Sequence, residues 1–219
     1  MFLVAVATEN ELRPLKQFFP SAEHLEVLVT GMGPTATAAS LSNYLSLHGS
    51  SIHGVMNIGV GGAYVNSGLT LLDICLAQQE VFGDFGICMQ DEILDFEPGL
   101  SLLSTPIVFN DELVSSSKNI LSVNDMAFKT ANFVTVNCCT GTKKRGDYLR
   151  QKFAAGCENM EGAAVAMVCN TFNIPCVELR CISNMVEDRN TAAWMLEEAI
   201  AKISRVAEVV LNEYGPPGH

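Results

Sequence analysis

Carboxylate and amide side chains follow apolar runs of this sequence at points where they could meet a bound small molecule. Glu11 comes just after the apolar run Phe2–Ala7, in the segment ATENEL, where a carboxylate could take a proton from water. Glu9 and Glu11 would equally well stabilise the start of a helix, because carboxylates favour the positive end of the helix dipole. The position of Glu11 therefore predicts a general base or an ordinary helix start.

Met160 and Glu161 lie in the segment Glu158–Ala164, at the start of a helix expected over Met160–Phe172. Acidic residues are common in a first turn. A carboxylate there can also accept hydrogen bonds from the two neighbouring hydroxyls of a ribose. The methionine offers polarizable apolar surface to the sugar. This pair predicts a ribose site, with a plain helix start as the alternative.

Ser183 and Asn184 end a strand expected over Cys176–Ile182. An asparagine after a strand often only makes a turn. Its side-chain amide, however, both donates and accepts hydrogen bonds. A 6-oxopurine needs both, because its O6 accepts a hydrogen bond and its N7, when protonated, donates one.

A glycine-rich stretch, Gly59-Val60-Gly61-Gly62, follows the buried run Val55–Ile58. It could be a tight turn, or a place where the backbone approaches a ligand closely. The spacing after Gly61 does not fit the dinucleotide pattern GxGxxG, and no Walker lysine follows. Dinucleotide and triphosphate binding are therefore disfavoured.

Buried strands that alternate with helices must position these groups. The expected strands are Phe2–Ala7, Glu26–Thr30, Val55–Ile58, Leu71–Gln78, Val134–Val136 and Cys176–Ile182. The expected helices are Glu9–Phe19, ended by Phe19-Pro20, then Thr35–His48, Met160–Phe172 and Thr191–Glu213. This order predicts the α/β class, a three-layer α/β/α fold with a central mixed, largely parallel sheet. One domain over residues 1–219 is expected, with a frayed tail at 215–219, and the detail of 82–132 is left open.

Four of the expected strand ends carry unusual chemistry. They are Thr8–Glu11, Gly31–Gly33, Gly59–Gly62 and Ser183–Glu187. In open α/β sheets, ligands bind beyond the carboxyl ends of the strands. We therefore expect these segments to converge on one site.

Composition excludes several classes of partner. The net charge of −11 disfavours nucleic acid and anionic membranes, and the charged fraction of 17% lies below the roughly 25% of average chains, which suits a homo-oligomer. No apolar run reaches the roughly 18 residues of a spanning helix, and no basic leader precedes Phe2, so a cytoplasmic protein is expected.

The eight cysteines form no CxxC pair, which predicts buried thiols and neither a metal nor a cofactor. Cys138-Cys139 falls in an expected site loop.

Five ordered segments together resemble a known family along nearly the whole chain. They are ATENEL, TGMGPTA, NIGVGGA, NMEGAAVA and RCISNMVEDR. They resemble the nucleoside phosphorylase and nucleosidase superfamily, most clearly the bacterial methylthioadenosine/S-adenosylhomocysteine nucleosidases. The resemblance implies a nucleoside phosphorylase-like fold and hydrolysis of an N-glycosidic bond.

The same resemblance implies roles for particular residues. Glu11 would activate the water, and Met160 and Glu161 would bind the ribose. Gly59, Gly61 and Gly62 would form a glycine-rich loop on the sugar or water side. The family commonly forms homodimers, so we expect a homodimer or higher homo-oligomer with a purine nucleoside as its ligand.

One departure from the family pattern points to a subgroup. The family's general acid is an aspartate, and Asn184 stands in its place. With Val186, Glu187, Arg189 and Trp194, this segment resembles the futalosine hydrolases, which release hypoxanthine from futalosine in menaquinone biosynthesis. Thr140-Gly141-Thr142 also fits their base loop. Asn184 would then stabilise the leaving base, with base contacts from Ser183, Thr140 and Gly141.

Two further features bear on the nucleophile and on the 5′ end. No arginine flanks the glycine run, and the nearest candidate, Arg13, falls on the first helix, which favours water over phosphate. Futalosine carries a benzoate at its 5′ end, and a cation or an amide of the protein should bind its carboxylate. The basic run Lys143–Arg145 could do so, although a solvated turn explains it equally well.

Three alternatives stay open. A methylthioadenosine-type nucleosidase would act on methylthioadenosine, and a purine nucleoside phosphorylase would need phosphate. A purine-binding protein on the same fold would not catalyse at all, although the presence of both Glu11 and Glu161 argues against it.

Overall fold

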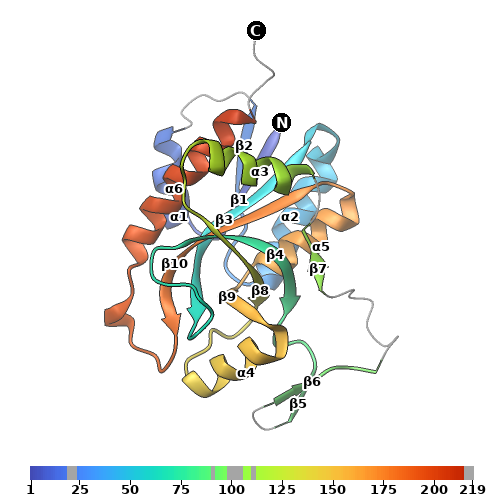
Figure 1. Cartoon of the computed structure of the whole chain (residues 1–219). Coiled ribbons are helices and arrows are strands. Elements are labelled where there is room, and N and C mark those ends of the chain that lie inside the picture. Colours follow the sequence, from blue (N-terminus) through green and yellow to red (C-terminus); the bar gives the residue numbers. More distant parts are fainter. Residues whose placement is uncertain (19–23, 90–91, 98–105, 110–111, 215–219) are drawn as a thin grey trace.

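The computed structural model describes residues 1–18, 24–89, 92–97, 106–109 and 112–214, shown in Figure 1. An eight-stranded mixed sheet forms its centre. The helices are α1 (Glu9–Phe18), α2 (Pro34–His48), α3 (Glu112–Val123), α4 (Lys143–Phe153), α5 (Gly162–Phe172) and α6 (Leu196–Glu213), with short 3-10 turns η1 (Gly49–Ser51) and η2 (Thr191–Ala193). The strands of this sheet are β1 (Phe2–Val6), β2 (Leu25–Val29), β3 (Gly54–Tyr64), β4 (Ile74–Phe82), β7 (Ile107–Val108), β8 (Lys129–Thr135), β9 (Ala155–Asn159) and β10 (Cys176–Val186). A separate hairpin joins β5 (Ile87–Met89) to β6 (Glu92–Leu94).

Helices cover both faces of the sheet, which confirms the predicted α/β/α layers. On one face α6 packs against α1, α3, β3 and β10, and on the other α2 packs against α5 (Figure 1). The buried residues of α6 recur every three or four positions, as Ala199, Ile203, Val206 and Val210 do, so one stripe of this helix faces the core. The first turn of α5 is rich in alanine, which lets the helix lie close to the strands beneath it.

Part of the sheet closes into a ring, which differs from the open sheet expected. Successive pairs join β3 to β10, β10 to β4, β4 to β8, β8 to β9, and β9 back to β3. The length of β3 makes this possible: on one side its residues Gly54–Asn57 pair with β1, while Gly62 and Ala63 pair with β9. One end of β3 therefore belongs to the flat sheet and the other end to the ring.

Two expected strands extend into the segments predicted to follow them. The run Gly59–Gly62 lies within β3 and not in a turn, because β10 pairs with it throughout. Ser183 and Asn184 likewise lie within β10, at an irregularity of register between Ile182 and Asn184. Both sets of site residues are therefore held by strand pairing.

Two predicted helices begin later than expected. Glu158 and Asn159 belong to β9, which pairs with β8 and β3, so α5 begins at Gly162 and not at Met160. The predicted helix Thr191–Glu213 is broken into η2 and α6. The break occurs because Trp194 is extended and the Met195 backbone N–H donates to the Ser183 carbonyl at 2.8 Å.

The remaining predicted boundaries agree with the structure to within a few residues, except that β8 begins at Lys129. Helix α4 was not predicted, and Lys143–Arg145 form its first turn and not a loop turn. The region left open, 82–132, contains β5, β6, β7, α3 and the start of β8. The expected end of α1 at Phe19-Pro20 and the expected frayed tail 215–219 lie outside the described residues. Within the described part of the chain, no helix is both long and apolar enough to cross a membrane.

Candidate active site

The expected strand ends converge on one cavity of about 280 Å³. It is bordered by the segments after β1 and β2, by the glycines of β3, and by the ends of β9 and β10. The residues that line it are Ala7, Thr8, Asn10, Glu11, Met32, Val60, Gly61, Gly62, Cys139, Thr140, Glu158, Asn159, Met160, Glu161, Arg180, Ser183, Asn184, Arg189, Trp194, Leu196 and Ile200. Gly59 and Gly141, two of the predicted site residues, do not line it.

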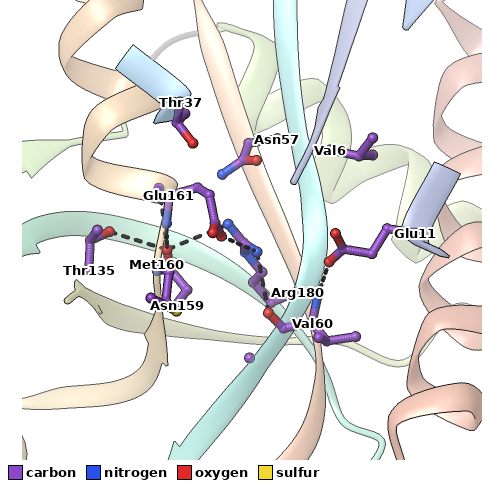
Figure 2. A network of polar contacts seen from close by, with 12 residues as sticks. Val6, Glu11, Thr37, Asn57, Val60, Thr135, Asn159, Met160, Glu161 and Arg180 are labelled. Atoms are coloured by element: carbon purple, nitrogen blue, oxygen red, sulfur yellow. Dashed lines mark hydrogen bonds and ion pairs between the residues drawn. The ribbon is translucent and has the colours of Figure 1, made fainter. Parts of the chain in front are cut away.

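Glu11 both caps α1 and faces the cavity. Its Oε2 accepts hydrogen bonds from the Thr8 backbone N–H at 3.0 Å and the Thr8 hydroxyl at 2.9 Å. The Glu11 N–H returns a 3.4 Å bond to the Thr8 Oγ1, which completes a capping box. The other oxygen accepts from the Val60 N–H at 3.3 Å (Figure 2).

Burial raises the pKa of Glu11, and the nearby Arg180 charge opposes this shift only in part. A carboxylate whose pKa lies closer to neutrality is a better general base. The environment of Glu11 therefore suits proton transfer from water.

Glu161 is held at the start of α5 by contacts to two distant parts of the chain. Its Oε1 accepts from the Gly33 N–H at 3.0 Å, and its Oε2 lies 3.3 Å from Arg180 Nη1. The side chain is almost fully buried. Since a carboxylate can accept about four hydrogen bonds, two acceptor positions stay available for a diol.

Arg180 is the centre of the buried network, and it was not among the predicted site residues. Its Nη1 donates to the Val60 carbonyl at 3.3 Å, and it lies between Val60 and Glu161 in Figure 2. Its Nε donates to Glu178 Oε1 at 2.9 Å. Burial lowers the pKa of Arg180, but the charges of Glu178, Glu161 and Glu11 raise it by more, so the guanidinium is charged.

A signal for Arg180 was present in the sequence. Glu178 and Arg180 stand two residues apart in the apolar run CVELRCIS, and residues at that spacing share one face of a strand. Because buried charges are seldom unpaired, this pair in a buried strand indicates a polar network under a site.

Asn159 fixes the backbone that presents Glu161. Its Oδ1 accepts from the N–H groups of Glu161 at 2.9 Å and Gly162 at 2.7 Å. N–H groups at the start of a helix have no acceptor within the helix, and a side-chain oxygen ordinarily accepts from them. Asn159 fills that role for α5. Asn159 was predicted only as part of the NMEGAAVA motif, and its capping role depends on strand β9, which the sequence did not predict.

Ser183 and Asn184 lie side by side in the lining of the cavity, near the end of β10. The Ser183 hydroxyl donates to Asn184 Oδ1 at 2.9 Å, and it also lies 3.3 Å from the Gly61 carbonyl. Asn184 Nδ2 donates one hydrogen to the Met185 carbonyl at 3.3 Å. The amide therefore keeps one N–H and one acceptor position for a ligand.

Glu158 anchors the loop that carries Thr140. The Thr140 N–H and hydroxyl donate to its two oxygens at 2.8 and 2.6 Å, and the Tyr64 hydroxyl adds a bond of 3.0 Å. Burial raises the pKa of Glu158, and the Thr140 bonds oppose the shift. Gly141 does not line the cavity, and its carbonyl accepts a hydrogen bond from the Arg189 N–H. Glu158 lines the cavity, yet sequence reasoning assigned it no role.

Met160 borders the cavity beside Cys139, whose thiol donates to the Met160 sulfur at 3.1 Å. Cys75, Cys157, Cys169, Cys176 and Cys181 are buried, as predicted, whereas Cys88, Cys138 and Cys139 are exposed. Although Cys139 is exposed as a residue, partial desolvation of its thiol raises the pKa of that group. Met160 and Cys139 thus give one wall of the cavity a soft apolar surface.

The glycines of β3 make room for neighbouring side chains. A Cβ at Gly59 would lie 2.5 Å from Arg180 Nη1 and 2.7 Å from Glu11 Oε1. A Cβ at Gly62 would lie 3.0 Å from Asn184 Nδ2. The glycine run therefore serves packing at Gly59, while Gly61 and Gly62 border the cavity itself.

Arg189 and Trp194 form the rim. The guanidinium carbon of Arg189 lies 4.9 Å from the centre of the Trp194 ring, within cation–π distance. No acidic side chain among the described residues forms a salt bridge with Arg189. In contrast, Lys143 begins α4, Lys144 and Arg145 line a different groove, and Arg13 is exposed on α1 outside the cavity.

This arrangement combines two kinds of polar group with a soft apolar wall. Glu11 and Glu161 are carboxylates near one buried cation, and Asn184 presents an amide to the same cavity. Such a site can accept hydrogen bonds from a diol, orient a water and contact a planar heterocycle.

Comparison with known proteins places this chain among nucleoside-processing proteins. The family model described as the Phosphorylase superfamily matches residues 8–212. The chain is 28% identical over 202 residues to the futalosine hydrolase of Thermus thermophilus, covering 87% of this chain and 84% of that one. It is 30% identical over 158 residues to the aminodeoxyfutalosine nucleosidase of Helicobacter pylori strain J99, covering 72% and 66%.

A solved structure shows the same fold. It is the Helicobacter pylori 5′-methylthioadenosine/S-adenosylhomocysteine nucleosidase in complex with an amino-pyrrolopyrimidine ligand. The TM-score is 0.84, with 22% identity and 97% of each chain covered. The nucleoside phosphorylase-like fold expected from the sequence is therefore confirmed.

Proposed function

Because the chain belongs to the Phosphorylase superfamily, we propose that it is a nucleosidase that hydrolyses the N-glycosidic bond of futalosine. It would release hypoxanthine and dehypoxanthine futalosine for menaquinone biosynthesis, as a cytoplasmic enzyme. The N-glycosyl hydrolase class has the firmest support, since the relatives compared above are named hydrolases or nucleosidases. The observation that carries the proposal is one cavity bordered by Glu11, Glu161 and Asn184.

The mechanism follows from how charge develops when the bond breaks. The sugar gains oxocarbenium character and the base gains negative charge, so groups that stabilise both ends lower the barrier. The Glu161 carboxylate accepts hydrogen bonds from the ribose hydroxyls, and Met160 packs against the sugar. Glu11 orients and deprotonates the attacking water.

Asn184 stabilises the leaving base at the other end. Its free N–H donates to O6 of hypoxanthine and its oxygen accepts from protonated N7, while the Ser183 hydroxyl holds the amide. Thr140, positioned by Glu158, borders the base. An amide does not supply the N7 proton, so that proton reaches the base from solvent or through a relay.

Water is favoured over phosphate as the nucleophile by the charges around the cavity. Contrary to the expectation from the sequence, Arg180 lies beside the glycine run in space, but it is paired with Glu178 and Glu161. Arg189, the other arginine of the lining, has no acidic partner among the described residues but lies at the exposed rim against Trp194. A phosphate pocket would need cations that are free to bind an anion beside the sugar.

The deciding experiment is incubation of the protein with futalosine in phosphate-free buffer, followed by chromatography for hypoxanthine. We expect hypoxanthine without added phosphate. Turnover that depends on phosphate would indicate a phosphorylase, and preferred turnover of methylthioadenosine would indicate the other nucleosidase. Faster release of adenine from the 6-amino analogue would make that analogue the substrate, and binding without turnover would indicate a purine-binding protein.

Arg189 would meet the 5′ benzoate, because its guanidinium has no acidic partner among the described residues. We predict that Arg189→Gln raises KM for futalosine about tenfold, in line with the loss of one hydrogen bond to a charged group. KM for 5′-methylthioinosine, which has no 5′ charge, should hardly change. Lys144→Gln, in the separate groove, is the matched control, and an equal effect of Arg189→Gln on both substrates would contradict the assignment.

A further inference from the structure

Two buried glutamates face each other beneath the first turn of α5, outside the lining of the cavity. Glu80 belongs to β4 and Glu178 to the antiparallel neighbour β10, and both are almost fully buried. A Cβ at Gly162 would collide with Glu80 Oε1 and with Glu178 Oε2. These two oxygens therefore lie against the same point of the α5 backbone, next to each other.

The hydrogen-bond partners of the pair leave one oxygen unexplained. Glu178 Oε1 accepts from Arg180 Nε at 2.9 Å and from Asn57 Nδ2 at 3.1 Å. Glu178 Oε2 is buried and receives no hydrogen bond from any described donor. Buried acceptors in native proteins nearly always have a donor, so a donor to this oxygen is missing.

Glu80 is the group best placed to supply it. Glu80 Oε1 faces Glu178 Oε2 and accepts from Asn159 Nδ2, while its Oε2 accepts from the Thr135 hydroxyl at 3.0 Å. Within the described chain, Glu80 forms no salt bridge. Two carboxylates this close cannot both be ionised without a strong electrostatic penalty.

The charges around the site lead to the same result. Among the described residues, five carboxyl groups are buried, whereas Arg180 is the one buried cation. The carboxylates are Glu11, Glu80, Glu158, Glu161 and Glu178. Because burying an unpaired charge is costly, some of these carboxyl groups must carry protons.

We propose that Glu80 is protonated and donates to Glu178 Oε2, so that the two residues form an acid–carboxylate pair which positions the ribose-binding Glu161. The proton lies on Glu80 Oε1 and is shared with Glu178 Oε2 only through the hydrogen bond. Glu178 keeps its charge for Arg180, and Glu80 stays neutral. The role of Glu161 rests on the proposed function, but the shared proton does not.

The electrostatic surroundings support placing the proton on Glu80. Burial first, and then the Glu178 charge, raise the pKa of Glu80 well above its ordinary value. Burial also raises the pKa of Glu178, but Arg180 opposes that shift through charge and a hydrogen bond. The titratable groups that face the pair from neighbouring elements are Tyr64, Cys75, Cys157, Glu161 and Arg180.

Two chains of contacts lead from the pair to Glu161. Glu178 holds Arg180, whose Nη1 lies 3.3 Å from the Glu161 carboxylate. Glu80 holds the amide of Asn159, whose Oδ1 accepts from the Glu161 N–H. Glu80 and Glu178 are therefore positioning residues, because they act on Glu161 through Arg180 and Asn159.

The first test is the infrared spectrum of wild-type protein and Glu80→Gln at neutral pH. We expect a protonated-carboxyl band that Glu80→Gln lacks and that the exposed control Glu9→Gln retains. An unchanged band in Glu80→Gln would overturn the proposal. If Glu80→Gln does not fold, the absence of any protonated-carboxyl band from the wild-type protein would overturn it as well.

The second test is the pH dependence of unfolding. Because the pKa of Glu80 is higher in the folded than in the unfolded chain, its stabilisation is complete below the unfolded value and is lost as pH rises toward the folded value. The equilibrium constant for unfolding should therefore rise more steeply with pH in wild type than in Glu80→Gln. The difference should reach up to about a factor of ten for each pH unit. Equal slopes would contradict a proton on Glu80.

The third test separates positioning from folding. With futalosine, Glu80→Gln should retain kcat to within about tenfold, since one hydrogen bond of modest strength is at stake. Glu80→Leu, which neither donates nor accepts, should lower kcat further without a matching rise in KM. Equal activity of the two variants would contradict the positioning role. Failure of wild type to cleave futalosine would overturn the proposed function and leave the first two tests valid.

Discussion

Glu11 combines two contacts that the sequence presented as alternatives. It completes a capping box with Thr8, as an ordinary helix start does, and it also reaches the Val60 N–H at the edge of the cavity. One carboxylate can do both because its two oxygens point to different partners. The structural contact fixes the side chain that the proposed chemistry needs.

A substitution that keeps the shape of Glu11 should separate these contributions. We predict that Glu11→Gln lowers kcat for futalosine by about 10²–10⁴-fold, the usual contribution of a general base. Hypoxanthine binding, measured by calorimetry, should be nearly unchanged.

Glu9→Gln is the matched control for this experiment. Glu9 stands in the same helical turn, and its side chain is 70% exposed. The Glu9→Gln variant should keep full activity. Substantial turnover by Glu11→Gln would exclude Glu11 as the base.

Asn184 should set the preference between purines. We predict that Asn184→Asp shifts the ratio of kcat/KM for futalosine to that for its 6-amino analogue toward the analogue by about tenfold or more. The reason is that a carboxylate in place of the amide N–H leaves O6 facing an acceptor, and a mispaired buried polar group costs about 1–3 kcal/mol.

Hypoxanthine and adenine release from the two nucleosides gives the ratio directly. Asn43→Asp, on the exposed side of α2, introduces the same charge away from the cavity and should leave the ratio unchanged. An unaltered ratio in Asn184→Asp would refute the base contact.

The sequence predicted the residues of the site that stand at strand ends and missed those that link them. Glu11 and Asn184 were named because each follows an apolar run, and Glu161 because it stands at the start of an expected helix. Arg180 was missed because its partner Glu161 lies 19 residues away on another element, and side-chain alternation within one strand does not show which face meets a distant carboxylate.

Among the elements, β3 and β10 shape the site most. Paired in parallel along their length, they carry the cavity glycines on one strand and Arg180, Ser183 and Asn184 on the other. The sequence indicated both strands but placed their ends too early, because glycine, serine and asparagine usually terminate strands. Here neighbouring strands on both sides outweigh that local tendency.

The start of α5 depends on a residue without a side chain. A Cβ at Gly162 would collide with the buried carboxyl groups of Glu80 and Glu178. We predict that Gly162→Ala lowers the free energy of unfolding by about 1–3 kcal/mol, the usual cost of overpacking a core. Urea denaturation measures the change.

Gly49→Ala is the matched control for this helix start. Gly49 has φ −56° at the end of α2, and its Cβ would have no neighbour closer than 3.8 Å. That substitution should be neutral or stabilise by up to about 1 kcal/mol, because alanine has fewer unfolded conformations. Equal losses in both variants would mean that the collision is relieved elsewhere.

At the scale of the whole molecule, the β5–β6 hairpin presents a group of exposed apolar side chains within the part of the chain that the structure describes. It extends away from the sheet (Figure 1), and it is attached to α4 through Tyr148, whose hydroxyl bonds to the Ile93 N–H and carbonyl. Ile93 faces α4 and is buried. Ile87, Met89 and Leu94 lie on the opposite face, because Ile87 pairs with Leu94 and alternate residues share a side.

That outer face is exposed and mostly apolar, with Glu92 opposite Met89 as its one charged residue among those described. Ile87, Met89 and Leu94 keep 47%, 55% and 46% of their surface accessible, although an isolated two-stranded hairpin is marginally stable in water. Grouped apolar residues on a surface usually mark an interaction site. With the low charged fraction of the chain, this favours a second copy as the partner.

We therefore predict a homodimer in solution, with a mass by light scattering of twice the chain mass of 23.6 kDa. Joint substitution of Ile87→Asp and Leu94→Asp should give a monomer, because burying two unpaired carboxylates in the interface is costly. Leu47→Asp is the control, since Leu47 is 70% exposed on α2, away from the hairpin. A monomeric wild-type protein, or a dimer that survives the joint substitution, would show that the hairpin does not bind a second copy.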